Sequence, residues 1–206
     1  MADRTTPPER VELPAGPAGP DGARAEALVI RRLVPEDAPA IARAVTESFD
    51  HLRPFLPWVT PENATVEGQR RRLESREWAW TPDAEHWGYG VFAAGDETSR
   101  VGSCGLHKRR GPQALEIGYW VHVAHLRRGI ATAAARAMTD AGFAVKGVEA
   151  MEILCDVANH ASAAVPRRLG YRLTDTIDHA AEAPGETGKR MVWTVTREEW
   201  RRAPHR

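Results

Sequence analysis

A basic turn between an expected strand and an expected helix is the part of this sequence best suited to bind an anion. The stretch 121–132 reads VHVAHLRRGIAT, and its helix would begin near Gly129. The first N–H groups of a helix lack partners and carry about half a positive charge, so they form a cradle for a phosphate or pyrophosphate. Gly129 and Ala131 would let such a ligand approach the backbone closely. The alternative is a simple helix start with solvated arginines.

The charge around this turn supports an anion site. From His107 to Arg136 there are six Lys or Arg residues and one acid, Glu116, so the local charge is +5 in a chain of 206 residues whose net charge is zero. A neutral chain does not favour non-specific contact with nucleic acid or with an anionic membrane, because both require excess cationic charge. We therefore expect a local anion site, no direct nucleic-acid partner and no membrane partner.

A second polar pair lies downstream of the turn. Asn159 comes just after an expected strand, and Ser162 lies three residues later at the expected start of a helix. Asn is common in turns and Ser is a preferred N-cap, so both residues also have a purely structural interpretation.

The elements that must position these residues alternate between strand and helix periodicity. A helix is expected after Pro35, a strongly charged and largely solvent-facing one from about Val66 to Trp80, and one from Ile130 that ends near Gly142. The expected strands are 28–33, 86–94, 100–108, 114–121, 151–157, 171–177 and 190–195, with a short helix at 162–169. This order predicts a single α/β domain with a mixed, mostly antiparallel central sheet flanked by helices.

The two ends of the chain differ in composition from its middle. Five of the fifteen prolines lie in the first twenty residues, so residues 1–26 are expected to be a flexible leader, with 11–13 either a loose strand or disordered. The domain is expected to span 27–197, followed by a basic tail at 198–206. The chain has two cysteines, no long apolar run and no secretory signal, and these features predict a cytoplasmic protein. A monomer or a homodimer is expected.

The basic turn and the segment that follows Asn159 together resemble the GCN5-related N-acetyltransferase (GNAT) superfamily. The turn is similar to its loop for the pyrophosphate of acetyl-CoA, and NHASAAVPRRLGY at 159–171 is similar to its next motif. The resemblance covers about residues 27–195. Within the superfamily, EIGYW at 116–120 and LRPFLPW at 52–58 are similar to patterns of the RimJ and RimL type of ribosomal-protein alanine acetyltransferase.

One position departs from the superfamily pattern. Three residues before the loop glycine the superfamily often has Gln or Arg, and this chain has Leu126. Because such a loop binds mainly through backbone N–H groups, we expect the change to be tolerated.

The resemblance implies an N-acetyltransferase in which the amine attacks acetyl-CoA directly within a ternary complex. No metal is expected to be needed. The residues implied to bind acetyl-CoA are Val121, Val123, Arg127, Arg128, Gly129, Ile130, Ala131, Thr132, Asn159 and Ser162. The backbone of the two valines would lie along the pantetheine arm.

Three residues are candidates for catalysis. By the resemblance, Ser162 would protonate or hydrogen-bond the leaving thiolate; its alternative role is a helix N-cap. Glu116, expected in the middle of the central strand, would accept the amine proton directly or through water; its alternative is an ion pair with an arginine. Glu182 lies where related enzymes also place an acid, although insertions affect its alignment.

The acceptor groove is implied to include the loop between the first two helices. Its expected lining is His51, Arg53, Phe55 and Trp58, although the two aromatic residues could instead anchor the loop to the core. Trp87 and Trp120 are assigned to the core.

The amine acceptor is expected to be a protein N-terminus. An α-amine has an unperturbed pKa of about 7.7–8.0 and lysine about 10.4, so a weakly basic carboxylate suits the α-amine better. A ribosomal protein is the expected example. A small amine such as an antibiotic, a polyamine or an amino acid is the alternative substrate, and a non-catalytic acyl-CoA-binding module is the alternative to an enzyme.

Two pairs of residues have the spacing of metal ligands. They are His122 with His125 and Cys104 with His107, but each pair supplies only two ligands and the first lies in the anion loop, so no metal is expected.

Overall fold

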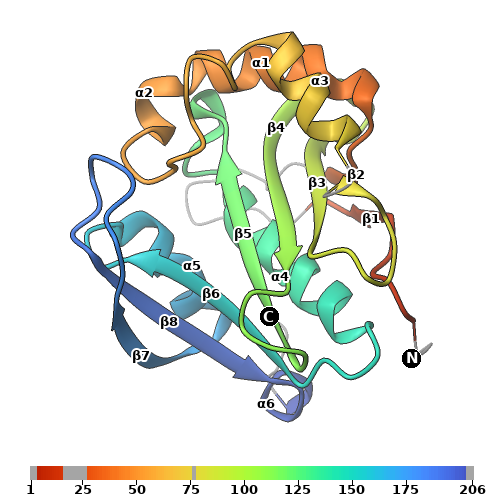
Figure 1. Ribbon diagram of the computed structural model, residues 1–206. Coiled ribbons are helices and arrows are strands. Elements are labelled where there is room, and N and C mark those ends of the chain that lie inside the picture. Colours follow the sequence, from red (N-terminus) through yellow and green to blue (C-terminus); the bar gives the residue numbers. More distant parts are fainter. Residues whose placement is uncertain (1–3, 16–26, 76–77, 203–206) are drawn as a thin grey trace.

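An eight-stranded sheet of order β1-β2-β3-β4-β5-β6-β8-β7 forms the centre of the protein (Figure 1). The computed structural model describes residues 4–15, 27–75 and 78–202. The strands are β1 (Arg10–Leu13), β2 (Leu28–Arg32), β3 (His86–Ala93), β4 (Asp96–His107), β5 (Ala114–Val121), β6 (Ala150–Asp156), β7 (Arg172–Asp178) and β8 (Lys189–Thr196). Neighbouring strands are antiparallel except β5 and β6, which are parallel. The predicted mixed, mostly antiparallel sheet is therefore confirmed.

Helices cover both faces of this sheet. They are the short 3-10 helices η1 (Pro35–Asp37) and η3 (Val123–His125), and α1 (Ala38–Glu47), α2 (Phe49–Leu52), α3 (Val66–Glu74), α4 (Ile130–Phe143), α5 (His160–Leu169) and α6 (Arg197–Arg202). α1 and α3 bury Ile41, Val45 and Leu73 against Phe92 on one face. α4 and α5 belong to the larger hydrophobic cluster on the other face. Among the residues that the structure describes, no helix combines the length and apolar composition needed to cross a bilayer.

Residues near both ends of the chain pack onto the domain. Residues 10–13 form the edge strand β1 paired with β2, so these positions belong to the sheet rather than to a flexible leader. Residues 1–3 and 16–26 of that predicted leader lie outside the described residues. In the expected basic tail, α6 buries Trp200, whose indole N–H donates to Asp140 Oδ1 at 2.7 Å.

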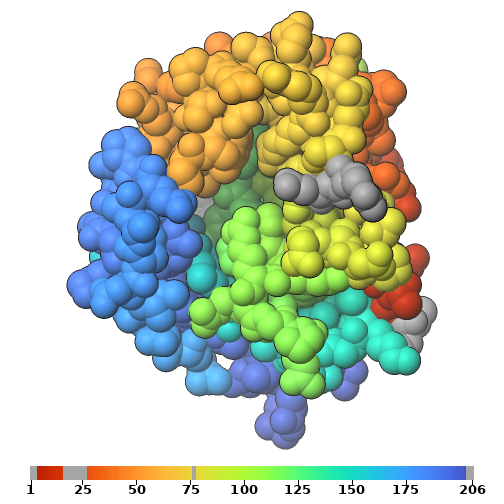
Figure 2. Space-filling view, viewed as in Figure 1, coloured from red at the N-terminus to blue at the C-terminus, as the bar shows by residue number. Residues whose placement is uncertain are grey.

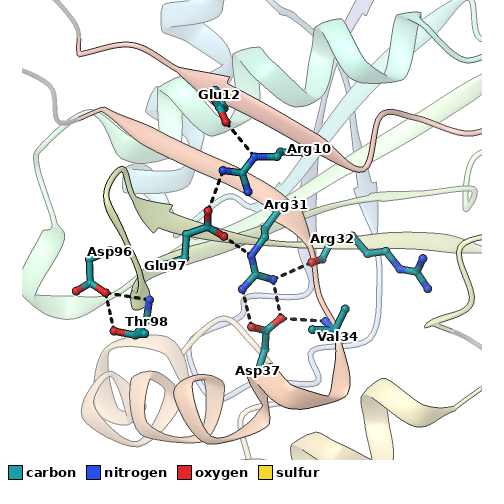
Figure 3. A network of polar contacts seen from close by, with 9 residues as sticks. All are labelled: Arg10, Glu12, Arg31, Arg32, Val34, Asp37, Asp96, Glu97 and Thr98. Atoms are coloured by element: carbon teal, nitrogen blue, oxygen red, sulfur yellow. Dashed lines mark hydrogen bonds and ion pairs between the residues drawn. The ribbon is translucent and has the colours of Figure 1, made fainter.

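A network of charged residues fixes this edge of the sheet to the start of α1 (Figure 3). Arg31 donates to both carboxylate oxygens of Asp37, at 2.8 and 2.9 Å, and to Glu97 at 2.6 Å. Arg10 of β1 reaches the other oxygen of Glu97 at 2.8 Å, and Asp37 also accepts the Val34 N–H. The network thus joins β1, β2, the β3–β4 hairpin and the first helical turn.

The charged helix is shorter and less exposed than predicted. α3 ends at Glu74 instead of near Trp80, because Ser75 has an extended backbone with φ −69° and ψ 151°. Thr65 Oγ1 accepts the Gly68 N–H at the start of the helix, at 3.0 Å. Gln69 is fully buried, so one side of the helix is not solvent-facing as the sequence suggested.

The end of α4 also differs from the prediction. Gly142 lies inside the helix, which continues to Phe143. A Cβ atom at Gly142 would collide with the end of the Met151 side chain on β6. Glycine therefore gives the Met151 side chain room between helix and sheet, and it does not terminate the helix.

Candidate active site

The sheet opens between its two parallel strands. β5 pairs with β6 only from Ala114 to Glu116, opposite Ala150 to Glu152. Beyond these pairs the strands diverge (Figure 1). A cavity of about 700 Å³ lies at this opening, and its lining includes residues of β4, β5, β6, the chain after α2 and the β7–β8 loop. Figure 2 shows the hollow between the orange α1–α2 region, the blue β7–β8 region and the green β4–β5 region.

The open edge of β5 presents backbone groups to this gap. The His122 N–H donates to Val101 O of β4 at 2.9 Å. Since backbone groups alternate in direction along a strand, those of Ile117, Tyr119 and Val121 point away from β4 and toward the opening. Val123 differs from the prediction, because its N–H already donates to Ser48 Oγ at 3.1 Å.

The basic turn has the backbone of an anion-binding loop. Arg127 has a φ of 63° and Gly129 a φ of 77°, so the chain curls twice through the left-handed region before α4 begins at Ile130. Successive N–H groups in such a turn form a concave nest for an anion. Gly129 is the N-cap and has no side-chain cap, so the first N–H groups of α4, including those of Ala131 and Thr132, find no side-chain acceptor there.

This nest is also accessible. Arg127, Arg128 and Gly129 are exposed, and no atom lies within 4 Å of a Cβ built on Gly129. The described residues here therefore fit the pyrophosphate-binding loop that the sequence predicted.

Ser162 lies beside a tyrosine that the sequence analysis did not single out. Asn159 is the N-cap of α5, and its Oδ1 accepts the Ser162 N–H at 3.0 Å. Ser162 is therefore not the N-cap, which was its alternative role. Its Oγ lies 3.2 Å from the hydroxyl of Tyr119, and that hydroxyl donates its one proton to the Ser162 carbonyl at 3.1 Å or to Oγ. Burial raises the pKa of Tyr119, so this phenol stays protonated and able to donate.

Glu116 is a buried carboxylate that lines the cavity. Glu116 lies near the start of β5 rather than in its middle. Val121, at the other end of the strand, is five positions further along, and each position adds a rise of about 3.3 Å. The side chain of Glu116 is 10% exposed, and Oε1 accepts from Arg109 Nη1 at 3.2 Å. Burial raises the pKa of Glu116 and the charge of Glu152 adds to the effect, whereas Arg109 and Arg190 oppose it. A carboxylate with a raised pKa is suited to accept a proton.

The β7–β8 loop closes one side of the cavity. Glu182 lines the cavity but is exposed, and its N–H donates to Glu186 Oε2 at 2.8 Å. Glu186 also accepts the Ala183 N–H and pairs with Arg190 at 3.2 Å. The buried carboxylate that organises this loop is therefore Glu186, whereas Glu182, the candidate catalytic acid, is an exposed residue of the cavity lining.

Two further contacts hold this loop. Asp156, at the end of β6, accepts the Thr187 N–H at 2.8 Å, and the Gly185 N–H donates to Pro54 O at 2.8 Å. Burial of Asp156 opposes ionisation, but the hydrogen bonds from Ala158 and Thr187 outweigh it and lower its pKa. The loop is thereby attached to the segment after α2.

The expected acceptor loop contributes only some of its predicted residues. Phe55 and Trp58 line the cavity, whereas His51 and Arg53 are exposed and do not. Trp120, which we assigned to the core, is half-buried and lines the cavity 6.3 Å from Trp58, measured between ring centroids. It faces the cavity because it lies on the same side of β5 as Glu116.

The predicted metal-like pairs have other roles. His122 Nε2 lies 2.8 Å from Glu47 Oε2, and its Nδ1 accepts the Ala124 N–H. Burial lowers the pKa of His107 to about 3, so this cavity-lining imidazole is neutral. No group of three or more potential metal ligands occurs in the described part of the chain.

Comparison with known proteins agrees with this geometry. The family model described as an acetyltransferase (GNAT) domain matches residues 27–172. The chain is 30% identical over 122 residues to the probable N-acetyltransferase YjcK of Bacillus subtilis (strain 168), a match that covers 58% of this chain and 66% of YjcK. The matched segments span about two thirds of the length of the curated relatives.

Solved structures share the fold. RimJ of Mycobacterium smegmatis, in complex with CoA-disulfide, superposes with a TM-score of 0.76 at 22% identity, covering 97% of this chain and 91% of RimJ. RimL, a ribosomal L7/L12 alpha-N-protein acetyltransferase in complex with coenzyme A, superposes with a TM-score of 0.69 at 20% identity, covering 90% and 99%.

Proposed function

The chain belongs to the GNAT family of acetyltransferases, and we propose from this premise that it acetylates the N-terminal α-amine of a protein, such as a ribosomal protein. It is an N-acetyltransferase, and acetyl-CoA is its acyl donor. One observation carries the proposal: Glu116, Ser162 and the open edge of β5 all line the same cavity. The likeness to RimJ and RimL supports a protein acceptor.

The described residues fit acetyl-CoA. The N–H groups of the turn 127–131 would hold its pyrophosphate, and the backbone edge at Tyr119 and Val121 would hydrogen-bond its pantetheine arm. Asn159 positions the start of α5 beside that arm. When bound, acetyl-CoA supplies an acetyl group activated as a thioester.

The chain's own residues account for the proton that the amine loses and for the negative charge on the departing sulfur. The new bond joins the amine nitrogen to the acetyl carbon, and the carbon–sulfur bond breaks. Glu116 accepts the proton that the amine loses, directly or through water. The Ser162 hydroxyl, supported by Tyr119, donates a hydrogen bond to the departing thiolate. Burial raises the pKa of Glu116 toward the pKa of an α-amine, about 7.7–8.0, whereas the pKa of lysine, about 10.4, lies farther away.

The first test is calorimetric titration with acetyl-CoA, followed by an acceptor assay. We expect one site per chain with a Kd in the micromolar range, roughly −8 kcal/mol. Mass spectrometry should then find one acetyl group on a peptide with a free N-terminus and an internal lysine. The same peptide with a formylated N-terminus should stay unmodified. Acetylation of lysine, or of spermidine in preference to the free peptide, would contradict the proposal.

Ser162→Ala should lower kcat about 10-fold with little change in the KM for acetyl-CoA, because one hydrogen bond of about 1.4 kcal/mol to the leaving group is lost. Tyr119→Phe should have a smaller effect in the same direction, since it removes the support for Ser162. Steady-state kinetics would measure both. Ser162→Thr keeps the hydroxyl and should retain most of the turnover. An unchanged kcat in Ser162→Ala would leave this residue with a structural role alone.

A further inference from the structure

One wall of the cavity is built from stacked cations and aromatic rings. The Arg72 guanidinium carbon lies 4.3 Å from the ring centroid of Trp78 and 5.1 Å from that of Trp58. Trp58 in turn neighbours Trp120, whose other neighbour is the guanidinium of Arg100 at 5.6 Å. We call these five residues the cation–aromatic wall. All of them except Arg100 line the cavity.

Arg72 has little polar compensation for its position. Its Nη1 donates to Gln69 Oε1 at 3.4 Å, and within the described residues it forms no ion pair with a carboxylate. Burial lowers the pKa of Arg72 to about 10, so the group still carries its charge at neutral pH. Among the described residues this desolvated cation has no counter-charge, which is costly, and a bound carboxylate would offset that cost.

The other cavity arginines already have partners. Arg109 pairs with Glu116 and Arg190 with Glu186. Among the described arginines that line the cavity, Arg72 therefore keeps N–H donors that no carboxylate occupies, and these donors can bind an incoming anion. Its planar guanidinium, held between two indole rings, is oriented in advance for two parallel hydrogen bonds to a carboxylate.

Arg72 and Glu116 line the same cavity. His107 is paired in register with Glu116, and the two side chains share one face of the sheet. The charges of both Arg109 and Arg72 act on His107 and assist burial in lowering its pKa to about 3. Three rings lead from Glu116 to Arg72. His107 lies 5.6 Å from His86, and His86 lies 4.7 Å from Trp78, measured between ring centroids, and Arg72 stacks on Trp78. An acceptor that reaches both groups must carry its amine and a carboxylate on the same short segment.

We propose that Arg72 binds an acidic side chain at the second residue of the acceptor, so that this enzyme prefers protein N-termini with Asp or Glu at that position. The inference rests on the proposed function and names the substrate class of the same site. The amine points toward Glu116 and the acidic side chain lies on Arg72, against the indole rings of the cation–aromatic wall.

The test compares two peptides that differ only at residue 2, beginning Ala-Asp and Ala-Asn. The wild-type enzyme should acetylate the Asp peptide with a kcat/KM about 10- to 100-fold higher, mainly through KM, because a charged hydrogen bond is lost in the Asn peptide. In Arg72→Met, which keeps apolar bulk between the indoles, this ratio should fall to about one. Arg72→Lys should restore part of it.

Arg71→Met provides the matched control. Arg71 is the preceding residue of α3, its side chain is exposed, and it pairs with Glu62 at the surface. The variant removes the same charge from the same helix and should keep the full Asp-to-Asn ratio. Thermal unfolding of both variants would detect a general loss of structure.

The outcomes separate the two levels of the proposal. Equal rates with both peptides, or a ratio that survives in Arg72→Met, would overturn the role of Arg72 and leave N-terminal acetylation intact. Acetylation of neither peptide would overturn the proposed function and this inference with it. Free aspartate, which carries both groups in a small molecule, is a third arm. Faster turnover of aspartate than of either peptide would overturn the assignment to protein N-termini.

Discussion

Glu116→Gln is expected to lower kcat by about 10²- to 10³-fold while acetyl-CoA still binds. The amide has nearly the shape of the carboxylate, so it fits the same buried position beside Arg109, but it cannot accept a proton from the amine. Measurement of kcat and of the acetyl-CoA Kd on the same preparation checks this. Glu152→Gln is the matched control, because Glu152 is the register partner on β6, pairs with Arg110 and does not line the cavity. This control should keep its turnover at neutral pH, although loss of its charge should lower the pKa of Glu116.

The pH profile adds a second readout for Glu116. Because burial raises the pKa of Glu116, the rate should fall on the acid side at a pH above the ordinary value of 4.5 for this side chain. Glu116→Gln should lose that acid limb and keep only the rise that follows deprotonation of the amine. An acid limb that is unchanged in the variant would show that another group accepts the proton.

Stability provides a control for the same variant. A carboxyl group whose pKa is raised by folding stabilises the folded state below its unfolded pKa, and that contribution is lost as the pH rises through the folded pKa. At neutral pH the ionised Glu116 therefore opposes folding. Glu116→Gln should not lower the unfolding temperature at pH 7, and loss of turnover could not then be attributed to unfolding.

Gly129→Trp is expected to weaken acetyl-CoA binding at least 100-fold, from the micromolar range to beyond calorimetric detection. Two physical effects act together. A non-glycine residue at φ 77° is strained by about 1–2 kcal/mol, and the indole would occupy the space in front of the N–H groups that begin α4. No atom lies within 4 Å of the position of the new Cβ, so the fold should remain intact.

The chain offers a matched control for this variant. Gly147, beyond the other end of α4, has a φ of 80° and the same open space around its Cβ position. Gly147→Trp should therefore have a comparable strain and leave acetyl-CoA binding unchanged. Gly129→Ala separates the strain from the steric block and should bind with intermediate affinity. Full affinity in Gly129→Trp would disprove the role of the turn as the pyrophosphate site.

Local periodicity was sufficient for most of the fold. The start of α4, the three-stranded β3–β4–β5 meander and the end of α5 at Gly170 follow from signals within a few residues of each element. The strand at residues 11–13 was one of two alternatives left open, because it depends on contacts with distant segments, and the end of α3 at Glu74 was not predicted. Thus β1 is fixed by Arg10 and Glu97, which are far apart in the sequence.

The candidate site was only partly predictable for the same reason. Gly129, Ser162 and Glu116 stood out by residue type and position. Arg72 resembled one more charge in a charged helix, and Glu186 one more acid in a polar loop. A charged residue at the end of a buried strand, Asp156, was a signal that could have been used. None of these residues reveals its partner until the strands and loops are brought together.

The short joint between β5 and β6 has a consequence for how this enzyme can evolve. Three paired residues on each strand connect the two parts of the sheet, and beyond them α4 packs against both strands. The helix presents mostly small residues there, including Ala134, Ala141 and Gly142. A larger residue at one of these positions would press the helix away from this face and change the packing beneath the opening. Substitutions on this face of α4 could thus change which molecules fit the cavity, without replacement of any residue that touches them.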